Sequence, residues 1–190
     1  PTLSSVSIAS NNSTSTLAIA GDVVTLTFTA SETIATPVVT FNPGGATITD
    51  TSVTYVNTSG NTWTAAYTAN ASDTSGAVSY SIAFSDTAGN AGTAVTSGSG
   101  SVAVDSTAPT MTIAAAEITD GGTSNDGTLS LTFTASEATT DFAVADISVI
   151  NGELSNFATT SSTVYTATFT PSSDGATTID VASSTFTDAA

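Results

Sequence analysis

The sequence contains no lysine, arginine, histidine or cysteine, whereas aspartate and glutamate together number sixteen, so the formal net charge is −16. Without cationic side chains the chain has no electrostatic basis for binding nucleic-acid phosphates or anionic lipids, and its surface repels both. The absence of histidine and cysteine excludes the common zinc, copper and haem ligand sets. It also excludes nucleophilic systems of the Ser–His–Asp and Cys–His kinds. We therefore expect that this chain is not an enzyme.

The lack of cysteine excludes disulfide bonds, so an extracellular protein of this sequence needs another form of bracing. Hard cations with oxygen ligands are what uncompensated carboxylates attract. No hydrophobic run approaches the roughly 20 residues of a membrane span, and we expect no direct membrane insertion. The chain opens on PTLSSVSIAS, without an initiator methionine or a signal-peptide pattern, which predicts a mature or excised piece of a longer protein.

An internal repeat organises the sequence. The heptapeptide LTFTASE occurs at residues 26–32 and again at residues 131–137. Matches in the same order at similar spacing indicate a tandem duplication of a unit of about 100 residues. We assign residues 1–105 to the first unit and residues 106–190 to the second. Two further matches support this division: WTAAYT (63–68) with YTATFT (165–170), and FSDTA (84–88) with FTDAA (186–190).

Short segments with a period of two fill both units. Apolar residues alternate with serine or threonine in residues 23–30, 78–84 and 129–135, which is the signal of a half-buried strand. Turn-forming clusters such as NPGG (42–45) and SSDG (172–175) separate the segments. We therefore predict an all-β fold, made of two tandem Ig-like antiparallel β-sandwiches in an elongated arrangement. The residues expected to face the core are Val24, Leu26, Phe28, Ala30, Val78, Tyr80, Ile82, Phe84, Leu129, Leu131, Phe133 and Ala135.

Three motifs carry a resemblance to a known family: VDSTAP (104–109) before the second unit, LTFTASE in both units and FSDTAGN (84–90) late in the first. Together they resemble the bacterial Ig-like repeats that occur in tandem in large surface and biofilm adhesins. The resemblance covers essentially the whole chain and implies a secreted, elongated and often Ca²⁺-dependent structural protein. It therefore implies an extracellular or cell-surface location. The complete lack of lysine and arginine departs from that pattern, and leaves open an acidic variant from a salty environment.

The acids at matched positions suggest Ca²⁺ sites at joints between domains. In a sandwich of this type the loop after the second strand (136–141) and the late loop (187–190) should lie at the pole where the linker enters. Asp105, Glu137 and Asp188 are predicted to converge there, because Ca²⁺ accepts six to eight oxygen ligands with flexible geometry. The alternative is that each acid is a solvated turn residue. The other metal candidates are Glu32 and Asp86 at the free end of the first unit, and Asp22 and Asp73 at its opposite pole.

The two units differ in how they finish. The first continues through TAVTSGSGSVAVD (93–105), which is enough for a last strand, whereas the second stops at FTDAA. We therefore expect the second unit to lack its last strand and to expose an unpaired edge. A cut made in a longer repetitive chain, donation of a strand by a neighbouring subunit and genuine shortening all explain this difference.

The predicted function is that of a structural or adhesive extracellular stalk module, rigidified by Ca²⁺ at its joints. The expected partners are adjacent Ig-like repeats or identical subunits, with host or cell-surface glycans bound through other regions. One alternative is a self-assembling surface-layer or filament subunit with strand donation between subunits. Another is a glycan-binding adhesin module, in which Trp63 and Tyr67 would form a stacking platform. Their counterparts Tyr165 and Phe169 indicate a repeated core strand instead.

Overall fold

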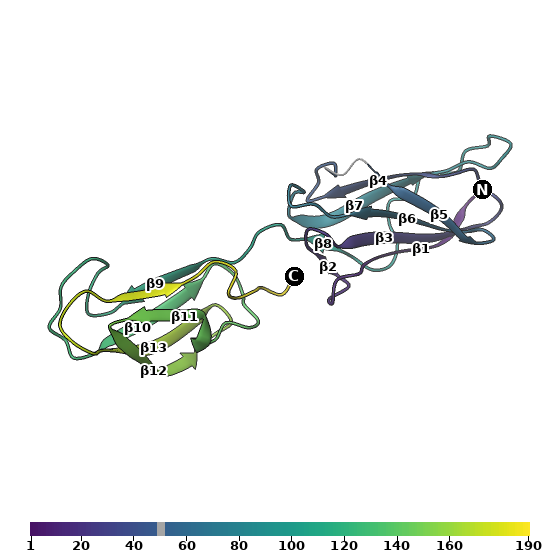
Figure 1. Ribbon diagram of the computed structural model, residues 1–190. Coiled ribbons are helices and arrows are strands. Elements are labelled where there is room, and N and C mark those ends of the chain that lie inside the picture. The colour runs from purple at the N-terminus through teal and green to yellow at the C-terminus, as the bar shows by residue number, and fades with distance from the viewer. Residues whose placement is uncertain (49–51) are drawn as a thin grey trace. The chain divides into compact units, whose positions relative to one another are not determined.

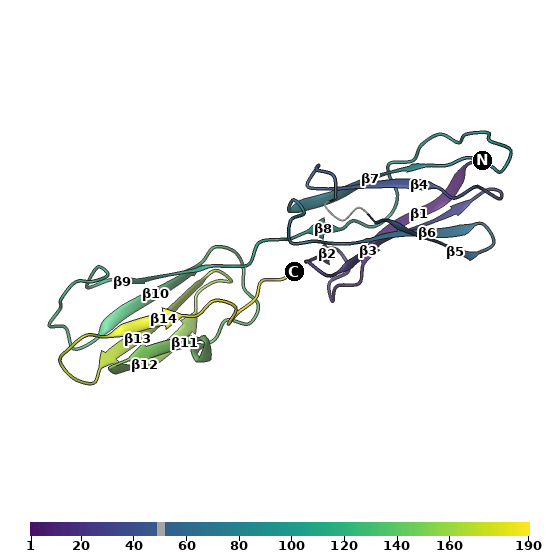
Figure 2. The same ribbon diagram turned by 45° about the horizontal axis from the view of Figure 1, so that its top comes forward.

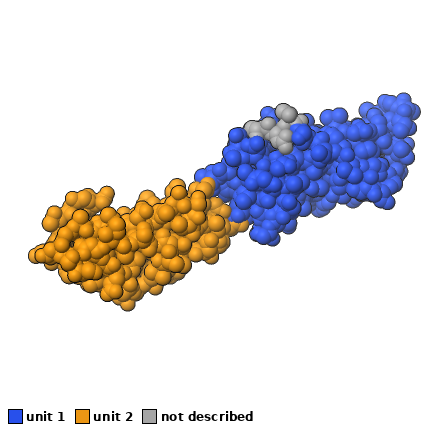
Figure 3. Space-filling model, viewed as in Figure 1, with its two compact units in different colours: residues 1–107, 190 blue, residues 108–189 orange. Residues whose placement is uncertain are grey.

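The chain is all-β and forms two compact units. The computed structural model describes residues 1–48 and 52–190, and divides them into unit 1 (residues 1–107 with Ala190) and unit 2 (residues 108–189), coloured separately in Figure 3. Each unit has its own hydrophobic core. Within the described residues the helical content is one 3₁₀ turn, η1 (Val144–Asp146). The prediction of an all-β fold is confirmed.

Unit 1 is a sandwich of two four-stranded sheets (Figure 1). The first sheet is antiparallel throughout. The second contains one short parallel pair, β2 with β8. In spatial order the first sheet consists of β1 (Leu3–Ser10), β3 (Val23–Ala30), β6 (Thr62–Thr68) and β5 (Thr54–Ser59). The second consists of β2 (Leu17–Ala18), β8 (Ala103–Val104), β7 (Gly76–Ala83) and β4 (Val38–Pro43).

Residues 92–104, here called the closing segment, join the two sheets of unit 1 along one side. The segment pairs with β7 through Val95, whose N–H donates to the Ile82 carbonyl at 3.1 Å. It then pairs with β1 through Ser99, whose N–H donates to the Val6 carbonyl at 2.9 Å. Its end returns to β7, and Val102 and Val104 are 1% and 2% exposed. The closing segment therefore seals the core between β1 and β7.

Unit 2 repeats most of this arrangement with fewer strands. Its second sheet has two strands, which cover the first through a shared core (Figure 2). Pairing makes β9 the counterpart of β1 and β14 the counterpart of β7, because β9 pairs with β10 and β14 pairs with β11. The first sheet has the order β12 (Gly152–Thr159), β13 (Val164–Pro171), β10 (Leu129–Ala135) and β9 (Met111–Ala115), and the second has β11 (Ile147–Ile150) beside β14 (Thr178–Val181).

The alternation read from the sequence agrees with the side chains that are buried. In β3 every second residue from Val24 to Ala30 is buried. In β7 the buried residues are Val78, Tyr80 and Ile82, and Phe84 just beyond the strand is buried as well. In β10 the pattern holds, except that Leu129 is only half-buried. These residues form the cores because a strand places alternate side chains on the same face.

A tyrosine hydroxyl joins the two sheets of unit 1 at their other edge. Tyr55 in β5 accepts a hydrogen bond from the Val39 N–H of β4 at 2.9 Å, and its hydroxyl donates to the Val39 carbonyl at 3.4 Å. Tyr67 differs, since its hydroxyl is buried and has no hydrogen-bond partner among the described residues. Burial and the negative charge of Asp73 raise the pKa of Tyr67, so its hydroxyl stays neutral.

The difference between the Tyr55 and Tyr67 hydroxyls allows a test of the hydrogen bond between Tyr55 and Val39. We expect Tyr55→Phe to lower the free energy of unfolding of unit 1 by about 1 kcal/mol, because a hydrogen bond is lost and the Val39 amide loses a partner. Urea unfolding followed by the fluorescence of Trp63, the one tryptophan, measures unit 1 selectively. Tyr67→Phe is the control and should leave the stability unchanged or slightly higher. Equal losses in both variants would contradict a specific role for the Tyr55 bond.

Candidate metal site

Two loops of unit 2 are held together by hydrogen bonds. The Thr140 N–H donates to the Thr187 carbonyl at 3.1 Å, and the Thr140 hydroxyl donates to the Asp188 carbonyl at 3.1 Å. The Asp141 carboxylate accepts hydrogen bonds from the Thr187 N–H at 2.7 Å and from the Thr187 hydroxyl at 3.1 Å. The loop after β10 and the late loop therefore lie at the same pole of unit 2, as the strand order predicts.

Two acids of unit 2 lie close together. One carboxylate oxygen of Glu137 and one of Asp188 lie within 4.8 Å of each other, and both residues are half-buried. Two oxygens bound to one Ca²⁺ at 2.3–2.6 Å can be at most about 5.2 Å apart. The spacing of these two oxygens therefore fits two ligands of one Ca²⁺, whereas Asp105, the third predicted ligand, belongs to unit 1.

Asp105 also shapes the backbone at the end of unit 1. It directly follows β8, and its N–H donates to the Ala18 carbonyl at 2.8 Å. Its Oδ1 accepts a hydrogen bond from the Thr107 N–H at 3.0 Å. This local turn fixes the direction in which the chain leaves β8.

Asp22 and Asp73 each close a turn in unit 1. Asp22 Oδ2 accepts hydrogen bonds from Asn12 Nδ2 at 2.8 Å and from the Ile19 N–H at 2.9 Å. Asp73 is 3% exposed, and its Oδ2 accepts a hydrogen bond from the Asn70 N–H at 2.9 Å. Both carboxylates thus satisfy backbone donors of neighbouring residues.

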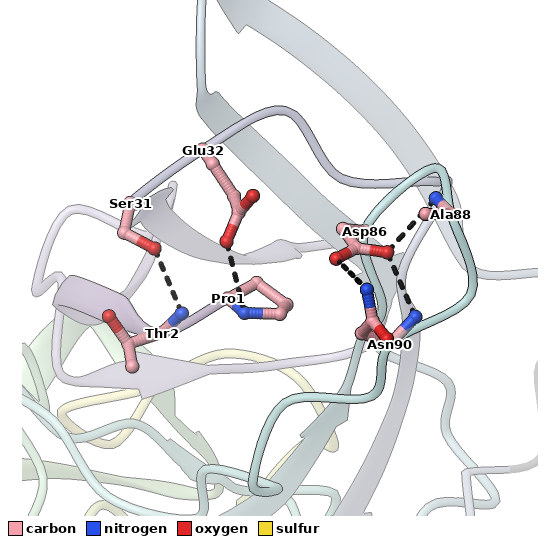
Figure 4. Close-up of polar contacts among 7 residues, drawn as sticks. All are labelled: Pro1, Thr2, Ser31, Glu32, Asp86, Ala88 and Asn90. Atoms are coloured by element: carbon pink, nitrogen blue, oxygen red, sulfur yellow. Dashed lines mark hydrogen bonds and ion pairs between the residues drawn. The ribbon is translucent and has the colours of Figure 1, made fainter.

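Glu32 and Asp86 face different partners at the other pole of unit 1 (Figure 4). Glu32 Oε1 lies 3.1 Å from the terminal amine of Pro1. Asp86 Oδ1 accepts hydrogen bonds from the backbone N–H groups of Ala88 and Asn90 at 2.9 and 2.8 Å, and its Oδ2 accepts one from Asn90 Nδ2 at 2.7 Å. Both carboxylates thus have partners within unit 1.

Two acids that the sequence did not single out have clear structural roles. Asp141 holds the late loop, as described above. Glu117, just after β9, accepts hydrogen bonds from the Ser130 N–H at 2.8 Å and the Ser130 hydroxyl at 2.7 Å. These hydrogen bonds lower the pKa of Glu117. No sequence signal links Glu117 with Ser130, because the pair is set by strand register.

Comparison with known proteins supports a bacterial Ig-like domain in the second half of the chain. Residues 105–190 match the family model described as bacterial Ig-like domain. Domains of this class are structural or surface modules and are generally not enzymes. No curated protein matched. In the part of the chain that the structure describes, no helix is long and apolar enough to cross a membrane.

Among solved structures, the chain is similar to the titin domains z1z2 in complex with telethonin. The identity is 10%, the TM-score is 0.28, and the match covers 88% of this chain and 82% of that one.

An acid titration can test whether the Asn90 side chain lowers the pKa of Asp86. The hydrogen bond from the Asn90 side chain is the largest cause that lowers the pKa of Asp86 below its ordinary value of 3.8. We expect Asn90→Ala to raise this pKa toward 3.8, measured by carboxyl ¹³C chemical shifts during an acid titration. The Glu117 pKa in the same titration is the internal control and should not move.

The sign of the stability effect follows from the direction of the Asp86 shift. Because the folded pKa is depressed, the contribution to stability is present above 3.8 and is lost as the pH falls through the lower folded value. An unchanged Asp86 pKa in Asn90→Ala would show that the two backbone donors alone hold the carboxylate.

Proposed function

We propose that this chain is a structural module of a repetitive extracellular surface protein, in which Ca²⁺ bound by Asp105, Glu137 and Asp188 stiffens the linker between the two units. The observation that carries the proposal is the approach of one carboxylate oxygen of Glu137 and one of Asp188 to within 4.8 Å of each other. The pair lies near the start of unit 2, since the N–H of Ser136, the residue before Glu137, donates to the Thr110 carbonyl at 2.9 Å. The family match at residues 105–190 supports a surface module of this class.

The charges of the three acids favour a bound cation. Two like charges 4 Å apart repel by about 1 kcal/mol in water and about 4 kcal/mol at the effective dielectric of a protein surface. The sequence contains no lysine, arginine or histidine that could offset this repulsion. A divalent ion from solution removes the repulsion and adds direct ligand bonds, so the cluster gains most from a hard cation such as Ca²⁺.

The linker is short, and one ion would restrict it further. Thr107 ends unit 1 and Ala108 begins unit 2. Ser106 is tied to unit 1, since its N–H donates to the Ser75 hydroxyl at 3.0 Å. Pro109 biases Ala108 toward extended backbone. An ion shared by Asp105 and the loops of unit 2 would remove much of the remaining freedom, which suits a stalk that transmits force.

The expected energy of one site is modest. Extracellular modules bind Ca²⁺ at about 10⁻⁴–10⁻³ M, so roughly 10 mM Ca²⁺ would stabilise the folded state by about 1.4–2.7 kcal/mol through mass action. For a domain of this size that corresponds to a rise in Tm of roughly 5–20 °C. An effect of this size is measurable and sufficient to make stiffness depend on the calcium concentration.

Burial argues for this role over the glycan-binding alternative. Tyr67 is 2% exposed and Trp63 packs against the core of unit 1. Among the described residues, the exposed large hydrophobic side chains are all aliphatic: Ile19, Val38, Val56, Val144 and Ile150. A sugar-stacking platform needs exposed aromatic faces, so the aromatic residues support a structural role. The proposal assigns no reaction to the chain.

The test is calorimetry of the whole chain in 10 mM CaCl₂ and in excess EDTA. We expect Ca²⁺ to raise the Tm of unit 2 within the range given above. Small-angle scattering of the same samples should show a narrower distribution of particle sizes with Ca²⁺, because the linker is restrained. Asp105→Asn, Glu137→Gln and Asp188→Asn should each remove most of the rise, since each deletes a charged ligand.

Asp120→Asn is the matched control, because it removes the same charge from an exposed loop of unit 2 that lies outside the cluster. This variant should keep the full response to Ca²⁺. Identical melting curves of the wild-type chain with Ca²⁺ and with EDTA would exclude the site. A response that survives in all three cluster variants would place the ion elsewhere.

A further inference from the structure

Unit 2 has a large open groove along one side of its sandwich. The groove has a volume of about 1640 Å³ and runs between β9 and β14, which belong to different sheets. Its apolar lining comes from Ile113, Leu129, Leu131, Phe169 and Ile179. Ile113, Leu129 and Ile179 are only half-buried, although they pack against the core of the unit. The side of the core that faces this groove is therefore incompletely covered.

In unit 1 the corresponding place is filled by the closing segment. That segment pairs with β1 at Ser99 and with β7 at Val95, and β1 and β7 are the counterparts of β9 and β14. It also brings Val102 and Val104 into the core, where both are almost fully buried. The same sandwich thus appears twice in one chain, once with the strand in place and once with the groove open.

The backbone of β14 is also available for pairing. Within unit 2, β14 pairs with β11 and with no other strand, whereas β7 in unit 1 lies between β4 and β8. A strand edge presents a row of N–H and C=O groups that can bind an added strand. The groove therefore offers both hydrogen-bonding groups and apolar surface to one extended polypeptide.

We propose that the groove between β9 and β14 of unit 2 binds an extended, uncharged polypeptide strand that residues 108–189 do not supply, with the Gly-x-Gly-x-Val-x-Val pattern of residues 98–104. The occupant is a strand of the closing-segment type and inserts its two valines over Ile113 and Ile179. This inference is independent of Ca²⁺ and concerns a different part of unit 2 from the acidic cluster.

The negative charge of the groove excludes an acidic strand as the occupant. Asp120, Asp126, Asp174 and Asp180 are among the residues that line the groove, so an acidic strand would be repelled. The closing segment of unit 1 has no charged residue over residues 92–104, which suits such a rim. A second copy of this chain is a poor donor, because its own closing segment is already bound in unit 1 with both valines buried.

The experiment uses the whole 190-residue chain and a synthetic peptide with the sequence of residues 91–104, AGTAVTSGSGSVAV. Methyl NMR of the labelled chain should show saturable shifts of Ile113, Ile179, Leu129 and Leu131 at or below roughly 1 mM peptide. Hydrogen exchange of residues 176–181 should slow by about tenfold or more, because the outer edge of β14 becomes paired. Signals from the core of unit 1 should stay unchanged, since its own closing segment occupies the matching place.

The control peptide carries Val102→Asp and Val104→Asp in the same sequence. It keeps the backbone donors but places carboxylates against an apolar and acidic groove, so it should produce no saturable shift. In a parallel arm each peptide is fused to the C-terminus through a flexible Gly/Ser linker, which raises its effective concentration to the millimolar range. The unaltered fusion should slow exchange of residues 176–181, and the aspartate fusion should not.

Three results would overturn the proposal. The first is the absence of methyl shifts and exchange protection for both the free peptide and its fusion. The second is an equal response to the valine and aspartate peptides, which would show that backbone pairing without the groove is sufficient. The third is a concentration-dependent dimer that gives the same methyl shifts without peptide, which would assign the groove to a second copy of the chain.

Discussion

Carboxylates in this chain have no lysine, arginine or histidine to pair with, so, apart from Glu32 beside the terminal amine of Pro1, the stabilising partners described above are neutral donors. The Asn90 side chain and two backbone amides hold Asp86, the Ser130 hydroxyl and amide hold Glu117, and Thr187 does the same for Asp141. Each such bond ties together two parts of the backbone. The acids therefore build turns and loop contacts, and Glu137 and Asp188 stand apart because their like charges approach each other.

Comparison of the two units shows that burial of the core of such a sandwich depends on the segment that covers the side between the two sheets. They share the strand order of the first sheet, and the β11–β14 pair of unit 2 matches the β4–β7 pair of unit 1. In unit 1, Val24 in β3, which lies at the repeat position of Leu129, is fully buried, and Val102 and Val104 are nearly so. In unit 2, Leu129 and Ile179 remain half-buried beside the groove. Similar local patterns thus give different burial, because burial depends on which segment covers the open side.

Local regularities in the sequence predict the strands and the inward-facing residues. The contacts that the sequence did not predict are pairings between residues that lie far apart along the chain. Alternation identified the inward residues of β3, β7 and β10, since the period of a strand is a property of consecutive residues. The meeting of the loops around Thr140 and Thr187 followed from strand direction. The Tyr55 bridge and the Glu117–Ser130 pair depend on register and on sheet spacing. Asp22 and Asp73 accept hydrogen bonds within their own turns, a contact that spacing alone did not predict.

Gly98 and Gly100 of the closing segment fix its register against β1 by steric exclusion. A side chain at Gly98 would place its Cβ 2.5 Å from the Val6 carbonyl oxygen, and one at Gly100 would lie 2.4 Å from that of Ile8. Gly100 also has a φ of +77°, which other residues rarely adopt. Sliding the segment by one residue would bring Ser99 and Ser101 against these oxygens. Only one alignment avoids that clash, and it is the one that sends both valines inward.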